Sequence, residues 1–144
     1  FEIAEEKFIR HITKSTLEVA GANEGWDVAL GLKAEIVPLT RPYGFYSGNI
    51  FQGVVMFNGK SVAGAEVEVE LYNEQGFKAP TEAHITQVVK TDSNGIFSFV
   101  MPKAGYWGFS ALLEDDKLLK HTDGKGYPVE IGAVFWVKVY DYEK

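Results

Sequence analysis

Two Asn-Gly pairs, each beside an alternating apolar segment, constrain the fold of this chain more than any other feature. Asn58-Gly59 follows an apolar run over residues 49–57, and Asn94-Gly95 comes directly before a second run over residues 96–101. An Asn-Gly pair supplies the two positive-φ positions of a tight hairpin turn, so strand, turn and strand are encoded locally. The middle of the chain is therefore predicted to be antiparallel β-structure.

The segment after the first turn has a strict two-residue period, in which apolar residues from Ala65 to Leu71 alternate with Glu66, Glu68 and Glu70. One face of this strand is expected to enter a core and the other to face water. Same-face residues lie about 6.5 Å apart, too far to share one small ion. Further strands are expected at residues 34–39, 85–90, 96–101, 106–113 and 129–140.

This strand pattern is typical of an all-β protein, an antiparallel Ig-like or prealbumin-like β-sandwich. Pro38 cannot donate to a ladder, which predicts an edge position for the strand at residues 34–39. Phe97 with Phe99, and Trp107 with Phe109, fall two residues apart, so each pair is expected to share a face that enters the core.

Residues 1–24 alternate only weakly, and we expect them to be an N-terminal segment, a remnant of an upstream domain, ahead of a sandwich domain at residues 25–144. Residues 14–20 are a candidate strand, and residues 1–12 are the one helical candidate. The first residue is Phe1 rather than Met, so a processed or truncated piece is expected, with any signal peptide outside it.

Composition narrows the classes of function. A chain of 144 residues can bury a core of its own, and the absence of cysteine excludes disulfides, thiolate metal sites and thiol nucleophiles. The net charge is −6 without a basic cluster, so no nucleic-acid partner is expected. No apolar stretch approaches the roughly 20 residues of a membrane span, so no membrane insertion is expected. The proline-marked edge gives no reason to expect more than a monomer.

The run from Asn58 to Val69, followed by Thr91-Asp92-Ser93-Asn94-Gly95-Ile96-Phe97, resembles the prealbumin-like modules of carboxypeptidase regulatory domains. The resemblance implies the sandwich architecture. Sandwiches of this kind carry many unrelated activities, so the chemistry stays open at this level.

Four further segments narrow the resemblance: residues 31–43, 83–92, 102–109 and 130–137. Together they look like the bacterial periplasmic proteins associated with nickel and cobalt uptake, over residues 24–140. The resemblance implies a periplasmic accessory protein whose partner is the membrane component of a metal transporter. It also implies Ni²⁺ or Co²⁺ as the ligand and no organic cofactor.

Imidazole and carboxylate groups are the side-chain metal ligands left without cysteine, and the histidines are His11, His84 and His121. His84 follows Glu82, and His121 follows Asp115 and Asp116. If the sandwich brings both loops to one end, these residues form a candidate site for nickel or cobalt. The alternative is that each histidine is an ordinary loop residue. Binding at such a site would weaken as pH falls through about 6 to 7, because protonated imidazole cannot ligate.

The cluster Tyr43, Phe45 and Tyr46 lies outside a clean alternation and is a candidate exposed patch for a partner protein or a sugar. The alternative is that these rings belong to the core. The corresponding alternative for the whole chain is a protein or surface-polymer interaction module with no metal site.

Catalysis is not expected. A hydrolase of purine breakdown and the intradiol dioxygenases share this scaffold, but the former's terminal Tyr-Arg-Gly-Ser signature and the latter's closely spaced histidine pair are both missing. No Gly-x-Ser-x-Gly elbow or phosphate-binding glycine loop is present.

Overall fold

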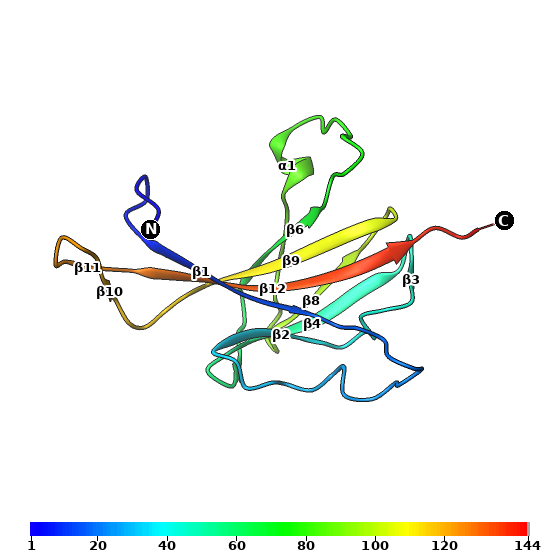
Figure 1. Ribbon diagram of the computed structural model, residues 1–144, viewed down its shortest axis with the longest axis horizontal. Helices are drawn as coiled ribbons and strands as arrows, with labels where there is room; N and C mark the ends of the chain where they lie inside the picture. Colours follow the sequence, from blue (N-terminus) through cyan, green and yellow to red (C-terminus); the bar gives the residue numbers. More distant parts are fainter. Residues whose placement is uncertain (144) are drawn as a thin grey trace.

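The chain folds into two stacked β-sheets, which confirms the predicted all-β sandwich. The computed structural model describes residues 1–143, and Figure 1 shows the sheets crossing at the centre of the molecule. Two pieces project from them: the hairpin of β10 (Leu119–Lys120) and β11 (Gly126–Tyr127), and a segment that carries the short helix α1 (Glu82–Ile85).

The larger sheet has the strand order β1-β12-β9-β6-β7, and β3 pairs with the far end of β12. Pairing is antiparallel except that β1 and β3 both run parallel to β12. The strands are β1 (Phe8–Ser15), β3 (Phe45–Tyr46), β6 (Glu66–Leu71), β7 (Gln87–Lys90), β9 (Gly105–Glu114) and β12 (Val129–Tyr140).

The smaller sheet is built around β4, with β2 on one side and β5 and β8 on the other. Its strands are β2 (Ala34–Pro38), β4 (Ile50–Phe57), β5 (Lys60–Ser61) and β8 (Ile96–Val100). Asn58 and Gly59 join β4 to β5 with φ angles of 49° and 75°, which confirms the predicted hairpin turn. The second pair is different: only Gly95 has a positive φ, and the Asn94-Gly95 turn connects β7 and β8, which lie in different sheets, so it does not close a hairpin. Pro38 lies on the edge strand β2, also as predicted.

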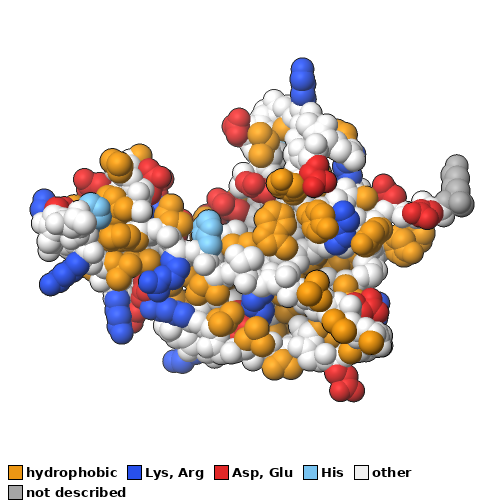
Figure 2. Space-filling view, in the orientation of Figure 1, with side chains coloured by type: hydrophobic (Ala, Val, Ile, Leu, Met, Phe, Trp, Pro, Cys, Tyr) orange, Lys and Arg blue, Asp and Glu red, His pale blue; other side chains and the backbone are white. Residues whose placement is uncertain are grey.

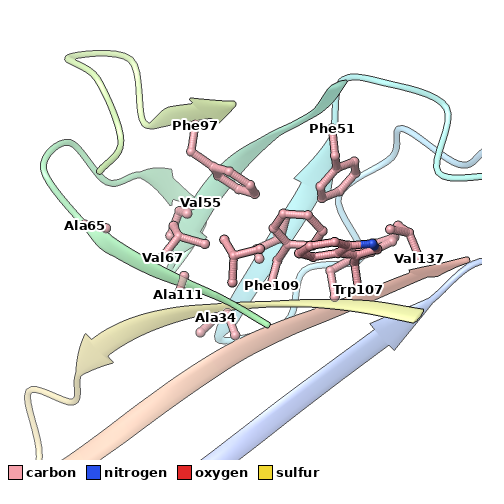
Figure 3. Close-up of a cluster of buried hydrophobic side chains, with 14 of the residues drawn as sticks. Ala34, Phe51, Val55, Ala65, Val67, Phe97, Trp107, Phe109, Ala111 and Val137 are labelled. Carbon is pink, nitrogen blue, oxygen red and sulfur yellow. The ribbon is translucent and has the colours of Figure 1, made fainter. Parts of the chain in front are cut away.

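Aromatic rings from both sheets form the centre of the core. Phe51 of β4 and Phe97 of β8 face Phe109 of β9 and Phe135 of β12, and all four are at most 1% exposed. Figure 3 shows Phe51, Phe97 and Phe109 pointing toward one another across the two layers, with Trp107 beside Phe109. The ring centroids of Phe51 and Phe109 lie 4.6 Å apart. Of the predicted period-two pairs, Phe97, Trp107 and Phe109 are buried, and Phe99 is partly buried against the core, which confirms that each pair faces inward.

The N-terminal region differs from its predictions. β1 covers Phe8–Ser15, so neither the helix at residues 1–12 nor the strand at residues 14–20 forms as expected. β12 offers β1 backbone partners along eight residues, from Phe8 opposite Val129 to Ser15 opposite Trp136. This ladder outweighs the weak local preferences of the segment. Residues 8–15, which the sequence places in a separate N-terminal segment, therefore belong to the larger sheet.

A buried ion pair joins β1 to β2. The Glu35 side chain is 2% exposed, and one of its carboxylate oxygens lies 2.7 Å from Lys14 Nζ. Its two oxygens also accept hydrogen bonds from the backbone N–H groups of Leu30 and Gly31, each at 3.0 Å. Lys14 Nζ additionally donates to the carbonyl of Ile36. Both oxygens of the buried carboxylate therefore accept at least one hydrogen bond.

Candidate functional site

The outer face of the larger sheet carries an open groove of about 390 Å³. We use "outer groove" for this feature, whose lining residues come from β1, β12, β9 and β6, the four strands that cross it. The lining is formed by Ile9, His11, Thr13, Glu68, Glu70, Gly108, Ser110, Leu112, Glu130, Val134 and Trp136. Figure 2 looks onto this side of the molecule, where hydrophobic side chains lie over β9 and β12 and acidic side chains border them toward β6.

Two glycines shape the outer groove. Gly108 lies opposite Trp136, and a Cβ added to Gly108 would come within 2.8 Å of the indole. Gly132 lies opposite His11, and a Cβ there would come within 2.8 Å of the imidazole. A side chain at either glycine would lift the neighbouring ring off the sheet. The two glycines therefore let Trp136 and His11 lie flat against the backbone, as aromatic residues do over strand glycines.

Carboxylates form one side of the outer groove. Glu68 is half-buried, and its pKa is raised first by that burial and then by the negative charges of Glu70, Glu130 and Glu66. Glu130 pairs with Lys7 at 2.7 Å, and Glu66 lies 3.6 Å from Lys90. Glu70 accepts a hydrogen bond from the Thr86 hydroxyl.

Glu68 and Glu70 are the glutamates without a cation at this site. Within residues 1–143, no lysine or arginine nitrogen comes within ion-pair distance of either carboxylate. The site therefore combines an aromatic surface with negative charge that its own side chains do not neutralise.

The same face continues past Trp136 as a row of aromatic side chains. Lys138 lies beside Tyr106 on the neighbouring strand, with Nζ 3.9 Å from the ring centroid of Tyr106 and 5.7 Å from that of Tyr140. Tyr106 and Tyr140 are 44% and 56% exposed. The aromatic surface thus extends toward the end of β12, and there it already carries a positive charge.

The structure does not gather the predicted metal ligands. His84 lies in α1 and His121 in the turn of the β10–β11 hairpin, which project from different parts of the molecule (Figure 1). Glu82 opens α1, two residues before His84. Across residues 1–143, no three histidine, aspartate or glutamate side chains come close enough together to hold a metal ion.

Asp115 and Asp116 follow β9 and face Lys33. Lys33 Nζ lies 2.6 Å from Asp115 and 3.7 Å from Asp116. The hydrogen bonds that Lys33 donates are the main cause that lowers the pKa of Asp115 to about 2. Asp115 is therefore ionised near neutral pH, but its charge is already neutralised by the lysine.

Each of the two predicted histidines has local contacts. His84 Nδ1 lies 2.8 Å from the Thr81 hydroxyl. The His121 ring packs against Phe1, with centroids 4.4 Å apart, and its Nδ1 lies 3.8 Å from Asp123 Oδ1. Among residues 1–143, the contact with Asp123 is the one place where a predicted histidine comes within ion-pair distance of a carboxylate.

The predicted aromatic patch is wrong at Phe45, which is 4% exposed. β3 pairs with β12, so that Phe45 lies opposite Val139 and its ring enters the core 6.1 Å from Phe51. Tyr46 is 40% exposed and stacks on Tyr142 at 3.9 Å.

Tyr43, the third member of the predicted patch, packs away from Tyr46. Its hydroxyl donates to the carbonyl of Ala22, and the Arg41 guanidinium lies 4.9 Å from its ring centroid. The two tyrosines therefore have separate surroundings and do not form one patch with Phe45.

Sequence reasoning missed the outer groove. Trp136 and Gly108 lie 28 positions apart in the sequence and meet because β9 and β12 pair. The signal that was available is the alternation of β12, which places Val134 and Trp136 on the face opposite Phe135 and Val137.

Comparison with known proteins places the chain in a family. A family sequence profile, described as a domain of unknown function (DUF4198), matches residues 1–115. The chain belongs to this family. The DUF4198 match spans β1 to β9 and leaves the β10–β11 hairpin and β12 outside it. No curated protein and no solved structure matches the chain. Within the described part of this DUF4198 chain, no helix has the length and hydrophobicity of a membrane span.

Proposed function

We propose that the chain is a non-catalytic docking domain whose outer groove binds a positively charged segment of a partner protein. One observation carries the proposal: Trp136 lies flat over Gly108 in a groove that also contains Glu68 and Glu70, neither paired with a cation within residues 1–143. An arginine or lysine side chain satisfies both features, since its apolar stem and charged head suit an indole face and its charge suits a carboxylate.

Other kinds of segment fit the outer groove less well. A purely apolar segment would cover Glu68 and Glu70 without pairing them, and burying an unpaired carboxylate is unfavourable. An acidic segment would be repelled by these glutamates and by the net charge of −6. A basic segment relieves the mutual repulsion that contributes to the raised pKa of Glu68.

The partner and the compartment come from the sequence resemblance. The likeness to periplasmic proteins of nickel and cobalt uptake supports a location in the periplasm and a docking partner in the membrane component of such a transporter. In this arrangement the domain is an accessory protein whose surface binds the transporter and catalyses no reaction.

The docking proposal is tested with a blocked peptide of alternating glycine and arginine, titrated into the purified chain at low salt. We expect a Kd of about 10–100 μM, shifts of the Trp136 indole N–H signal in the NMR spectrum, and weakening with salt. Trp136→Ala and the Glu68→Gln/Glu70→Gln double variant should each weaken binding by about tenfold. Binding should also weaken as pH falls through the raised pKa of Glu68, because the protonated acid no longer attracts the peptide.

Matched controls separate recognition from folding. Trp26→Ala removes a tryptophan that lines a different depression, and Glu74→Gln/Glu143→Gln removes two exposed charges outside the outer groove. Both controls should bind the peptide as the wild type does. Equal affinity for a glycine and glutamate peptide, or no loss of binding in the Trp136 and glutamate variants, would overturn the proposal.

Ion capture by this domain, which the sequence resemblance implies, has little support, because its strongest feature is the single 3.8 Å contact between His121 Nδ1 and Asp123 Oδ1. Two side-chain donors leave most of the coordination of nickel or cobalt to water or to another chain, so the isolated domain should bind these ions weakly. Calorimetric titration is expected to show no saturable binding below about 1 mM nickel or cobalt. The His84→Ala/His121→Ala variant should behave in the same way. Binding of about 0.1 mM or tighter that this variant loses would instead establish direct ion handling.

A further inference from the structure

A second cavity, of about 230 Å³, opens at the end of the sandwich where β6 leads into the segment carrying α1. We propose that this cavity, here called the end pocket, binds a small organic carboxylate with an apolar body. The end pocket shares no residue with the outer groove, and this inference does not depend on the docking proposal.

The inner walls of the end pocket are apolar and continuous with the core. Val69, Leu71 and Trp107 reach it from β6 and β9, and Phe77 and Ile85 close it from the projecting segment. The only polar group of Trp107 is occupied, because its Nε1–H donates to the carbonyl of Lys103 at 2.8 Å. The indole therefore presents only carbon atoms to the end pocket, and these suit the apolar part of a ligand.

The polar groups around the end pocket are basic or neutral. Lys78, Lys103 and His84 line it together with two side-chain amides, and no aspartate or glutamate is among the lining residues. In a chain of net charge −6, this local absence of acid makes the opening complementary to an anion. A hydroxyl proton donated by Thr81 to His84 Nδ1 would leave Nε2–H as a further donor.

The end pocket is held open by contacts within its own wall. The Asn73 side chain makes two hydrogen bonds to the backbone of Phe77: Oδ1 accepts from the N–H and Nδ2 donates to the carbonyl, each at 2.8 Å. The ammonium group of Lys103 lies 3.7 Å from the Phe77 ring centroid, which ties the projecting segment to the turn before β9. A ligand would thus enter a formed pocket and need not order the loop, which favours binding.

The size of the end pocket selects the class of ligand. A cavity of about 150 Å³ lined by apolar side chains accommodates benzene. The 230 Å³ here leaves room for an aromatic or branched aliphatic body with one carboxylate directed to the lysines. An inorganic anion would leave the Trp107 and Leu71 surfaces uncovered, and a neutral hydrocarbon would leave the basic rim unused.

The test uses benzoate and hexanoate as probes, with benzamide and hexanamide as neutral counterparts of the same shape, against the full chain near pH 7. Ligand-observed NMR reports binding, and so does the change in tryptophan fluorescence, to which Trp107 in the wall of the end pocket contributes. For ligands of about ten non-hydrogen atoms we expect a Kd of about 0.1–1 mM for the acids and at least about tenfold weaker binding of the amides.

Three variants locate the site. Lys103→Gln should weaken benzoate binding by about fivefold to tenfold, whereas the matched Lys138→Gln, on the outer face, should leave it unchanged. Ala79→Trp, at an exposed lining position, fills the opening and should abolish binding while the chain stays folded. Equal affinity for benzoate and benzamide, no binding of either acid at about 10 mM, or full binding by Ala79→Trp would overturn the inference.

Discussion

Replacing Lys14 with methionine is expected to lower the free energy of unfolding by about 3–5 kcal/mol, which for a domain of this size is a large part of the total. Methionine keeps much of the length and apolar stem of the lysine but removes its charge. The Glu35 carboxylate, 2% exposed, is then left in the interior without a cation. Urea denaturation followed by tryptophan fluorescence measures the loss.

Two further variants separate charge from packing. Lys90→Met removes a lysine whose side chain is 67% exposed and should change stability by only a few tenths of a kcal/mol. Adding Glu35→Gln to Lys14→Met removes the stranded charge while keeping an acceptor for the N–H groups of Leu30 and Gly31, so much of the stability should return. If the double variant is no more stable than Lys14→Met, the account based on charge is wrong.

The Lys14–Glu35 pair also makes the free energy of unfolding depend on pH in the acid range. Burial alone would raise the pKa of Glu35, but Lys14 and the N–H groups of Leu30 and Gly31 outweigh it, so the pKa lies below its ordinary value of 4.5. The stabilisation is therefore complete above about pH 4.5 and is lost as pH falls through the lowered pKa. In Lys14→Met burial acts unopposed by the lysine, and acid unfolding should begin at higher pH.

Gly95→Ala is expected to destabilise the chain by about 3 kcal/mol, from two additive causes. Gly95 has φ +78°, a conformation that alanine adopts only with strain. An added Cβ would also lie 2.9 Å from both the backbone nitrogen of Val62 and Cβ of Ser61, and a backbone atom cannot move aside as a flexible side chain can.

Gly59→Ala is the matched control for this prediction. Gly59 has nearly the same φ, +75°, but a Cβ there would have nothing within 4 Å. The control should therefore lose only the stability that the positive φ costs an alanine, about 1 kcal/mol. The difference between the two variants in chemical denaturation measures the close approach of the Asn94-Gly95 turn to β5 and Val62. Equal losses would show that this approach adds nothing.

The sequence predicts the strands best between residues 50 and 113, where each relevant signal is local. The alternation in β6 and the Asn58-Gly59 turn need only neighbouring residues to specify strand and hairpin. β1 has no such signal, because Arg10 and Lys14 occupy the same face as Phe8 and Ile12. Lys14 is accommodated there by Glu35, and no local rule connects these two residues before the sheets are stacked.

The candidate sites were less predictable for the same reason. The sequence identifies His84 and His121 as metal-binding residue types, but whether α1 and the β10–β11 hairpin meet depends on the topology of the sandwich. Phe45 was expected at the surface because its segment lacks alternation, and its pairing with β12 places it in the core. The outer groove is formed by residues on neighbouring strands. The sequence gives these residues, but it does not show which strands pair or in which register.

The position of β12 determines when this fold can form. The last strand along the chain lies inside the larger sheet, with β9 on one side and β1 and β3 on the other, and it contributes Ile131 and Phe135 to the core. Strands from both ends of the sequence must therefore meet before the sheet is complete, a long-range closure that slows folding. A growing polypeptide of this sequence stays without its finished core until residues 129–140 have been synthesised. Until then β9 presents an unpaired edge, on which chaperones can act and by which incomplete chains can associate.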